Sequence, residues 1–456
     1  MVLRLAGWVE QEREAIVERL VDWLRIPSIS AHPERAADVR ASAERCAALL
    51  ADAGLEHAEV LETPGAPAVY ADWLHAGDDA PTFLVYGHHD VQPVDPLELW
   101  ETDPFEPTMV GGELRGRGSV DDKGQTAYEI EALRGLLATD GSLPVNVKVL
   151  IEGEEEVGSP NFEDLLERHR GRLACDAVVV SDTTMWGPGV PSTCVGMRGL
   201  VAYDVKVRTA TGDLHSGVFG GAVPNPAHLL ASVVAALHDA EGRVTIPGFY
   251  DRVRPLTDAE ERSLAELPFD ETAWMQMAGV RRLEGEAGWS TLARVGYRPT
   301  CEVVGIGAGY QGDGMKTIVP ATGGFKVTFR LVADQDPKEV DAAFRAWLAE
   351  RIPHGVDCTV TPEGGVAPCL TPVDHPYVGA LTRAIGRVWE KDVLFTREGG
   401  SGPEEALGRV LAAPVLFLGV GFPDDRFHAP NERLVMDQFW KGLLAAGELF
   451  GELGRL

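Results

Sequence analysis

Histidines and carboxylates gather at five places in this sequence, each close to the end of a predicted strand. The five groups are His88 with Asp90, Asp121 with Asp122, Glu154 with Glu155 and Glu156, Asp182, and His428. Open α/β sheets bind ligands outside the carboxyl ends of their strands, so we expect these groups to meet at one edge of one sheet. Two histidines with several carboxylates form a ligand set for Zn²⁺ or Mn²⁺.

The number of acids favours two metal ions over one. A single ion would leave several carboxylates unused and repelling one another. With two ions, each could take one histidine and one terminal carboxylate, and a further carboxylate would bridge them. Two-metal hydrolases hold their ions about 3.5–4 Å apart and clamp a water between them. The pattern therefore predicts hydrolytic chemistry.

The elements that would position these groups alternate between strands and helices in the first part of the chain. Residues 83–86, 145–151 and 177–180 are almost continuously apolar, as strands buried on both faces of a mainly parallel sheet are. A helical stripe of Ala127, Ile130, Leu133 and Leu137 lies between the first two of these strands, and Gly141 is expected to end that helix. Strand–helix alternation predicts an α/β layer domain.

The pattern changes after Arg198. Residues 201–209 and 323–332 alternate apolar and polar side chains, as half-exposed antiparallel strands do, and helical patterns occupy 227–237 and 337–352. A second α/β stretch follows, with a helix over 377–388 and a strand over 415–420. The simplest topology is therefore an α+β domain inserted into an α/β domain.

Length, charge and cysteine usage limit the possible functions. The chain has 456 residues, which predicts two domains, and a formal net charge of −29. Such a surface repels phosphate backbones and anionic lipids, so we expect neither nucleic-acid nor membrane partners. The charged N-terminus predicts an amphipathic helix rather than a signal peptide. Six scattered cysteines without CxxC spacing indicate buried thiols and a reducing cytoplasm.

Nine motifs in order give the sequence a family resemblance. They are YGHHDVQP, GRGSVDDKGQ, EGEEEVGS, VVSDTTMW, GMRGL, DLHSGVFGG, TFRLV, REGGSGP and FHAPNE, from Tyr86 to Glu432. The set resembles the M20 family of co-catalytic metallopeptidases, especially its dipeptidase (carnosinase-like) branch. The resemblance implies a mainly parallel α/β catalytic domain with helices on both faces, residues 1–195 and 371–456. An inserted α+β lid and dimerisation domain, residues 196–370, would interrupt it.

The same resemblance implies a role for each site residue. His88 and Asp182 would bind one metal, Glu156 and His428 the other, and Asp121 would bridge them. Asp90 would orient the site from behind His88, and Glu155 would be the general base. The substrate carboxylate would be held by Arg330 with Gly400 and Ser401, and His215 would reach the oxyanion from the partner subunit of a homodimer. The substrate would be a small peptide, and the ions two Zn²⁺, with Mn²⁺ as the alternative.

Other functions stay open at this point. Dipeptidase relatives often carry a histidine near TPEGGVAP, where this chain has Glu363, so specificity is less certain than catalysis. An N-acyl-amino-acid deacylase on the same fold is the main alternative. A nucleotide-dependent oxidoreductase would need GAGYQG, Gly307 to Gly312, to be followed by a helix, and the residues after it do not predict one. A catalytically silent binding protein would not need every acid.

Overall fold

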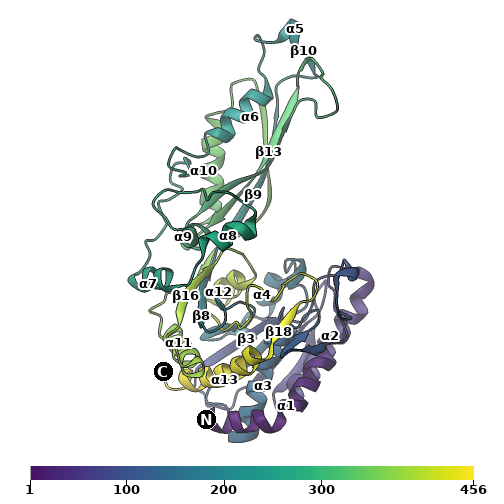
Figure 1. The fold of residues 1–456 in the computed structure, drawn as a ribbon, viewed down its shortest axis with the longest axis vertical. Helices are drawn as coiled ribbons and strands as arrows, with labels where there is room; N and C mark the ends of the chain where they lie inside the picture. The colour runs from purple at the N-terminus through teal and green to yellow at the C-terminus, as the bar shows by residue number, and fades with distance from the viewer. Residues whose placement is uncertain (1) are drawn as a thin grey trace.

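The computed structural model describes residues 2–456, and a six-stranded sheet forms the centre of its larger part (Figure 1). The four strands β6, β3, β7 and β17 pair in parallel, while β1 and β2 continue the sheet with antiparallel pairing. The strand order is β1 (Glu56–Leu61), β2 (Ala68–Trp73), β6 (Asn146–Glu152), β3 (Thr82–His88), β7 (Ala177–Val180) and β17 (Val415–Phe417). The carboxyl ends of the parallel strands therefore share one edge.

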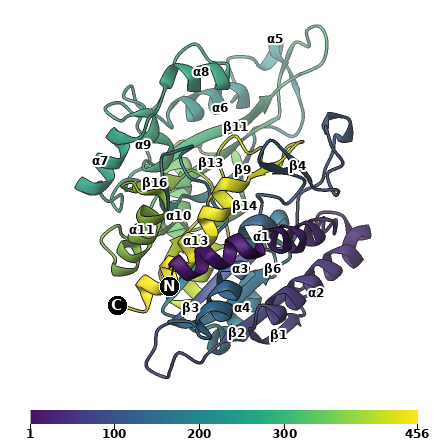
Figure 2. The ribbon, with the colours of Figure 1, turned by 60° about the horizontal axis from the view of Figure 1, so that its bottom comes forward.

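Helices cover both faces of this sheet because its strands are apolar on both sides. Phe83 and Val85 pack into one hydrophobic cluster, whereas Leu84 and Tyr86 pack into another. Figure 2 shows α1, α3 and α13 gathered on one face of the sheet, the face of Phe83 and Val85. That face carries α1 (Val2–Leu24), α2 (Ala36–Asp52), α3 (Lys123–Asp140), α11 (Pro376–Trp389) and α13 (Met436–Leu453), and the other carries α4 (Phe162–Leu173) and α12 (Glu404–Leu411).

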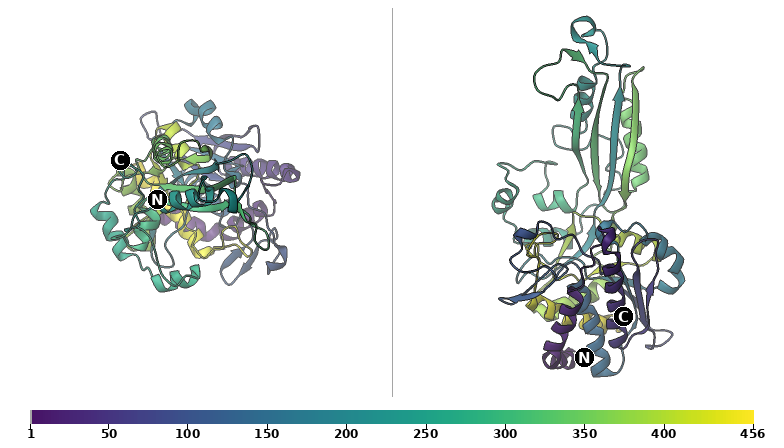
Figure 3. Two further views of the ribbon diagram at one scale, coloured as in Figure 1. Left: turned by 90° about the horizontal axis from the view of Figure 1, so that it is seen from above. Right: turned by 90° about the vertical axis from the view of Figure 1, so that its right-hand side faces the viewer.

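A four-stranded antiparallel sheet projects away from the larger part, and the right-hand view of Figure 3 shows its strands side by side. Its order is β11 (Thr300–Ala308), β13 (Thr322–Leu331), β9 (Gly199–Arg208) and β14 (Asp357–Val366). The helices α6 (Pro226–Ala235) and α10 (Pro337–Ala349) pack on it around Phe329, Phe344 and Trp347. At its far end lie β10 (Leu214–His215), α5 (Ser216–Phe219) and β12 (Ile318–Val319) (Figure 1).

A three-stranded sheet lies where the two parts meet. The buried Arg397 of β16 pairs with Glu260 of α7, so α7 is attached to this sheet. The sheet contains β15 (Cys369–Leu370), β8 (Ser192–Met197) and β16 (Leu394–Glu398), and the helices near it are α7 (Asp258–Glu266), α8 (Glu271–Ala278) and α9 (Thr291–Gly296). The remaining elements are β4 (Thr108–Val110), β5 (Glu113–Arg115), β18 (Arg433–Val435) and three 3₁₀ helices at Pro33–Arg35, Leu97–Leu99 and Glu155–Val157.

The predicted fold class is confirmed, with a mainly parallel α/β sheet and an inserted α+β part. The strand predicted over 415–420 is shorter and ends at Phe417. All six cysteines are free, as predicted, but only Cys46, Cys194 and Cys301 are buried, while Cys175 and Cys369 are partly exposed and Cys358 is exposed. Gly307 lies within β11, and no helix follows Gly312, so the dinucleotide fingerprint lacks its required helix. Within residues 2–456, no helix combines the length and apolar character needed to cross a membrane.

Candidate metal centre

The predicted ligands meet at the carboxyl edge of the central sheet. His88 is the last residue of β3 and is fully buried, and Asp182 follows β7 by two residues. Nε2 of His88 lies 3.1 Å from Oδ1 of Asp121 and 3.4 Å from Oδ2 of Asp182. One potential ligand atom from each of these three residues lies within 4.8 Å of the others.

A second group of three shares Asp121 with the first. Nε2 of His428 lies 2.9 Å from Oδ2 of Asp121 and 3.1 Å from Oε2 of Glu156. Glu156 belongs to the 3₁₀ helix after β6, and His428 adopts a left-handed backbone with φ of 56° in the loop after β17. The two oxygens of Asp121 thus face two different histidines, which is the arrangement a bridging carboxylate needs.

Asp90 fixes the position of His88 relative to Glu155 and Glu156. Its Oδ1 lies 3.4 Å from Nδ1 of His88, on the ring edge opposite to Asp121. The same carboxylate accepts hydrogen bonds from the backbone N–H of Glu155 (3.3 Å) and Glu156 (3.1 Å). A carboxylate behind a histidine fixes the ring orientation of a metal ligand. Asp90 therefore links the end of β3 to the loop that carries the two glutamates.

The electrostatics of the cluster fit divalent cations. Burial alone would lower the pKa of His88, but the surrounding aspartates outweigh it and raise that pKa well above its ordinary value. Hydrogen bonds to Asp121 and Glu156 raise the pKa of His428 to about 10. Burial and repulsion between the acids raise the pKa of Glu155 and of Glu156. In addition, Oε1 of Glu156 is buried with no hydrogen-bond partner among the described residues. Two cations would satisfy these acids.

Three neighbours of the cluster have structural contacts. His89 turns away from it, since successive side chains of an extended segment point to opposite faces, and its Nε2 lies 2.9 Å from the carbonyl oxygen of Pro67. Glu154 is buried rather than solvated and accepts from the Ala66 N–H at 2.9 Å. Asp122 precedes α3 without capping it by a side-chain hydrogen bond, and its Oδ2 instead accepts from the His88 N–H at 3.1 Å.

The predicted substrate residues lie in two separate places. Nη1 of Arg330, near the end of β13, donates a 3.1 Å hydrogen bond to Oγ of Ser401, which follows Gly400 in the loop after β16. Ser401 and Glu155 line one cleft of about 890 Å³ between the two parts of the molecule. His215 is exposed at the far end of the projecting sheet (Figure 1), away from the metal cluster of the same chain.

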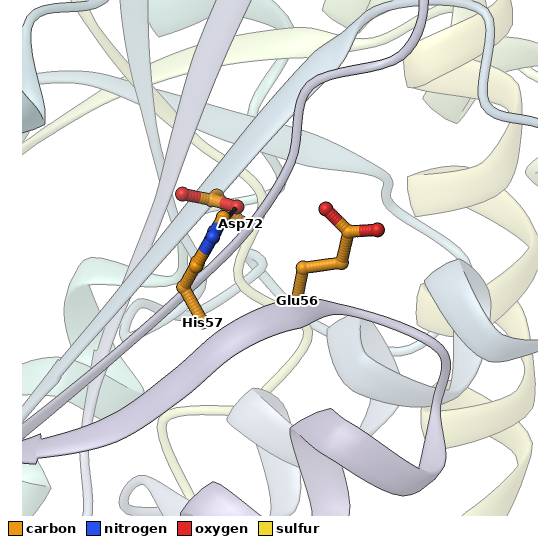
Figure 4. A group of neighbouring side chains, drawn as sticks. All are labelled: Glu56, His57 and Asp72. Atoms are coloured by element: carbon orange, nitrogen blue, oxygen red, sulfur yellow. Dashed lines mark hydrogen bonds and ion pairs between the residues drawn. The ribbon is translucent and has the colours of Figure 1, made fainter.

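A third group of His, Asp and Glu side chains lies on β1, an edge strand of the central sheet, and on its neighbour β2 (Figure 4). Nδ1 of His57 lies 2.8 Å from Oδ1 of Asp72, and the hydroxyl of Tyr70 donates to the other Asp72 oxygen at 2.8 Å. Oε1 of Glu56 lies 3.1 Å from Nε2 of His75. Because these groups are already paired with one another, we interpret this cluster as a surface polar network.

Sequence reasoning missed two residues that support the cluster. Glu432, in the FHAPNE motif, is fully buried, and its carboxylate accepts from the backbone N–H of Asp121 at 3.1 Å. Gln92, in YGHHDVQP, donates from Nε2 to Oε2 of Glu156 at 2.8 Å. Both lie inside motifs already singled out, so their position in those motifs was the available signal.

Comparisons with known proteins point to one family. The family model described as Peptidase family M20/M25/M40 matches residues 84–450. A Beta-Ala-His dipeptidase of Mus musculus is 28% identical, over 99% of this chain and 95% of that protein. A Cys-Gly metallodipeptidase of Schizosaccharomyces pombe is 30% identical, over 95% of this chain and 94% of that protein.

Solved structures of two peptidases are also similar to this chain. An M20 family metallo-carboxypeptidase from Sulfolobus solfataricus superposes with a TM-score of 0.82 at 31% identity, covering 97% of this chain and 99% of that one. Human carnosine dipeptidase 1 superposes with a TM-score of 0.75 at 27% identity, covering 100% and 99%.

Proposed function

The chain belongs to peptidase family M20 and is a metallopeptidase, and we propose that it hydrolyses dipeptides or very short peptides with a free C-terminal carboxylate. The observation that carries this proposal is the position of Asp121 between two histidines, each with its own second carboxylate. The proposed ligands are His88 and Asp182 for one ion, His428 and Glu156 for the other, and Asp121 for both. We propose Zn²⁺ as the native metal, with Mn²⁺ as the alternative.

Glu155 is the proposed general base. When bound, the two ions would activate a water and polarise the scissile carbonyl. The backbone of Glu155 is fixed by Asp90, while its carboxylate has no hydrogen bond or ion pair to any of residues 2–456 and lines the cleft. It can therefore take a proton from the attacking water and deliver it to the leaving amine.

The substrate carboxylate is the proposed ligand of Arg330 and Ser401, next to Gly400. Arg330 and Ser401 are already hydrogen-bonded to each other, and Ser401 shares the cleft with Glu155. A planar guanidinium matches a carboxylate with two parallel N–H donors. A site that binds the terminal carboxylate of the substrate close to the scissile bond would select short peptides with a free C-terminus.

We also propose that the working enzyme is a cytoplasmic homodimer whose inserted domain, residues 196–370, acts as a lid. The position of His215 supports this, because it lies at the far end of the projecting sheet and cannot serve the metal cluster of its own chain in this arrangement (Figure 1). A partner's projecting sheet could bring the equivalent histidine to the substrate oxyanion.

Two experiments test the function. Metal-loaded protein, with a chelator control, is offered dipeptides, a tripeptide and N-acetyl amino acids. Chelator-sensitive cleavage of the peptides alone supports the proposal, and cleavage of the acetylated compounds alone replaces it with deacylation. The tripeptide is included because the similar structure with a TM-score of 0.82 is a metallo-carboxypeptidase. A carboxypeptidase removes the C-terminal residue of peptides longer than two residues.

The second experiment isolates the general base. We expect Glu155→Gln to lower kcat at least about 100-fold, because general-base catalysis contributes on that order, while two metals stay bound. Glu167→Gln, on the exposed face of α4, is the matched control and should keep full activity. Loss of both metals from Glu155→Gln would refute the assignment of Glu155 as base.

A further inference from the structure

Two arginines at the base of the projecting sheet lack an acidic partner. Arg198 lies between β8 and β9, Arg330 lies near the end of β13, and both are half-buried. Within residues 2–456, no carboxylate oxygen lies within 4.0 Å of either guanidinium, although the chain carries a net charge of −29. By contrast, the well-buried guanidiniums of Arg117, Arg298 and Arg397 each pair with a glutamate.

The two guanidiniums belong to one small structure. Leu200 of β9 pairs with Arg330 of β13, so Arg198 and Arg330 are near neighbours across the two strands. Oγ of Ser401 accepts the hydrogen bond from Arg330 and donates one to the backbone oxygen of Arg198. Burial and the repulsion of Arg330 lower the pKa of Arg198 to about 10, although Glu302 opposes this.

Arg198 is packed against the loop that would bind the substrate carboxylate. Its Nε donates a 3.3 Å hydrogen bond to the carbonyl oxygen of Gly399, and the structure gives its guanidinium no other hydrogen bond to the described residues. A Cβ atom at Gly399 would lie 2.9 Å from Nη2 of Arg198, so the absence of a side chain at 399 lets the guanidinium lie there. Most of its donors remain available to a ligand.

We propose that Arg198 and Arg330 form a pocket of two guanidiniums that binds a peptide whose C-terminal residue is acidic. Arg330 takes the α-carboxylate, as in the proposed function, and Arg198 takes the side-chain carboxylate of aspartate or glutamate. The inference rests on the proposed function, because it assigns the substrate class of the same site. Its physical basis is that two neighbouring positive charges without internal acids are neutralised by a ligand with two negative charges.

The test uses substrates that differ only in one charge. Ala-Glu is compared with Ala-Gln, and Ala-Asp with Ala-Asn, at low ionic strength. We expect kcat/KM for the acidic member of each pair to be about tenfold higher or more, since charge-assisted hydrogen bonds to carboxylates are strong. A ratio near one in the wild-type enzyme would overturn the proposal without any variant.

Variants then assign the preference to Arg198. In Arg198→Gln we expect the Glu/Gln ratio to fall to near one, because kcat/KM for Ala-Glu falls about tenfold and kcat/KM for Ala-Gln falls much less. Arg208→Gln, on the exposed far end of β9, is the matched control and should keep the wild-type ratio. An equal loss for both substrates in Arg198→Gln would show that both arginines share one carboxylate, and would overturn the proposal.

A binding measurement separates this inference from the proposed function. Free L-glutamate and L-glutamine are titrated calorimetrically into the metal-loaded Glu155→Gln protein, which requires no turnover. Tighter binding of glutamate, lost in Arg198→Gln/Glu155→Gln, supports the pocket even if the dipeptides prove to be poor substrates. Equal binding of the two amino acids refutes the pocket, while dipeptide hydrolysis would still support the proposed function.

Discussion

Glu432 offers the sharpest test of how the metal cluster is held in place. Its Oε1 accepts hydrogen bonds from the N–H groups of Val120 (2.9 Å) and Asp121 (3.1 Å). Its Oε2 accepts from the N–H of Gly118 (3.0 Å) and from Nη1 of Arg117 (2.6 Å). Both partners of this ion pair are buried, so a single carboxylate fixes the segment that presents the proposed bridging ligand.

We expect Glu432→Gln to lower the free energy of unfolding by about 3–5 kcal/mol, the usual cost of stranding one partner of a buried ion pair. The amide keeps one accepting oxygen and replaces the other with an NH₂ group, so two of the four hydrogen bonds lose their acceptor. Burial raises the pKa of Glu432 even beside Arg117. Since burying the Glu432 carboxylate is itself unfavourable, the expected loss comes mainly from leaving Arg117 buried without an acidic partner.

Urea unfolding of the metal-free protein measures this loss, and a chelator competition measures metal affinity in the same variant. Because the backbone of Asp121 loses its anchor, we also expect metal affinity to fall about 10–100-fold. Glu339→Gln removes the exposed partner of Arg252 and should cost no more than about 1 kcal/mol. The double variant Arg117→Met/Glu432→Gln should lose less than the sum of the single changes, since no charge is stranded. A loss below 1 kcal/mol in Glu432→Gln, with unchanged metal affinity, would refute the reasoning.

Two further predictions concern titrating groups outside the proposed ligands. Burial raises the pKa of Glu129 from 4.5 to about 7, so this residue alone should lower the free energy of unfolding by on the order of 3 kcal/mol as pH rises from 4.5 to 7. Glu129→Gln should remove this contribution from the pH dependence of the free energy of unfolding in urea, and a pH dependence equal to that of the wild-type protein would contradict the burial argument. The hydrogen bond to Asp72 raises the pKa of His57, so any stability it contributes is present at low pH and is lost as pH rises through the raised value. Asp72→Asn should lower this pKa, as followed by NMR of the His57 ring, and no change would show that the pair is not formed in solution.

The sequence was sufficient to predict the strands that carry the cluster. The apolar runs before His88, Glu152 and Asp182 become β3, β6 and β7, and these strands are neighbours with parallel pairing. Parallel strands bring their carboxyl ends to one edge, so polar residues that follow them meet there whatever their separation along the chain. The proximity of His88 and Asp182 follows from that rule, whereas Asp121 follows no strand of the central sheet and reaches the cluster from the residues just before α3.

Contacts that depend on two loops meeting could not be predicted in the same way. The ion pair between Arg117 and Glu432 joins residues 315 positions apart, and neither lies at the end of a strand of the central sheet. Arg198 was part of a motif, but its lack of an acidic partner is visible only once β9, β13 and the loop after β16 are packed together. Residue type and spacing predict which groups can do chemistry. Whether a charge is paired or free for a ligand is decided by tertiary packing, and this is why the chemistry of the site was predictable while the specificity proposed for Arg198 required the structure.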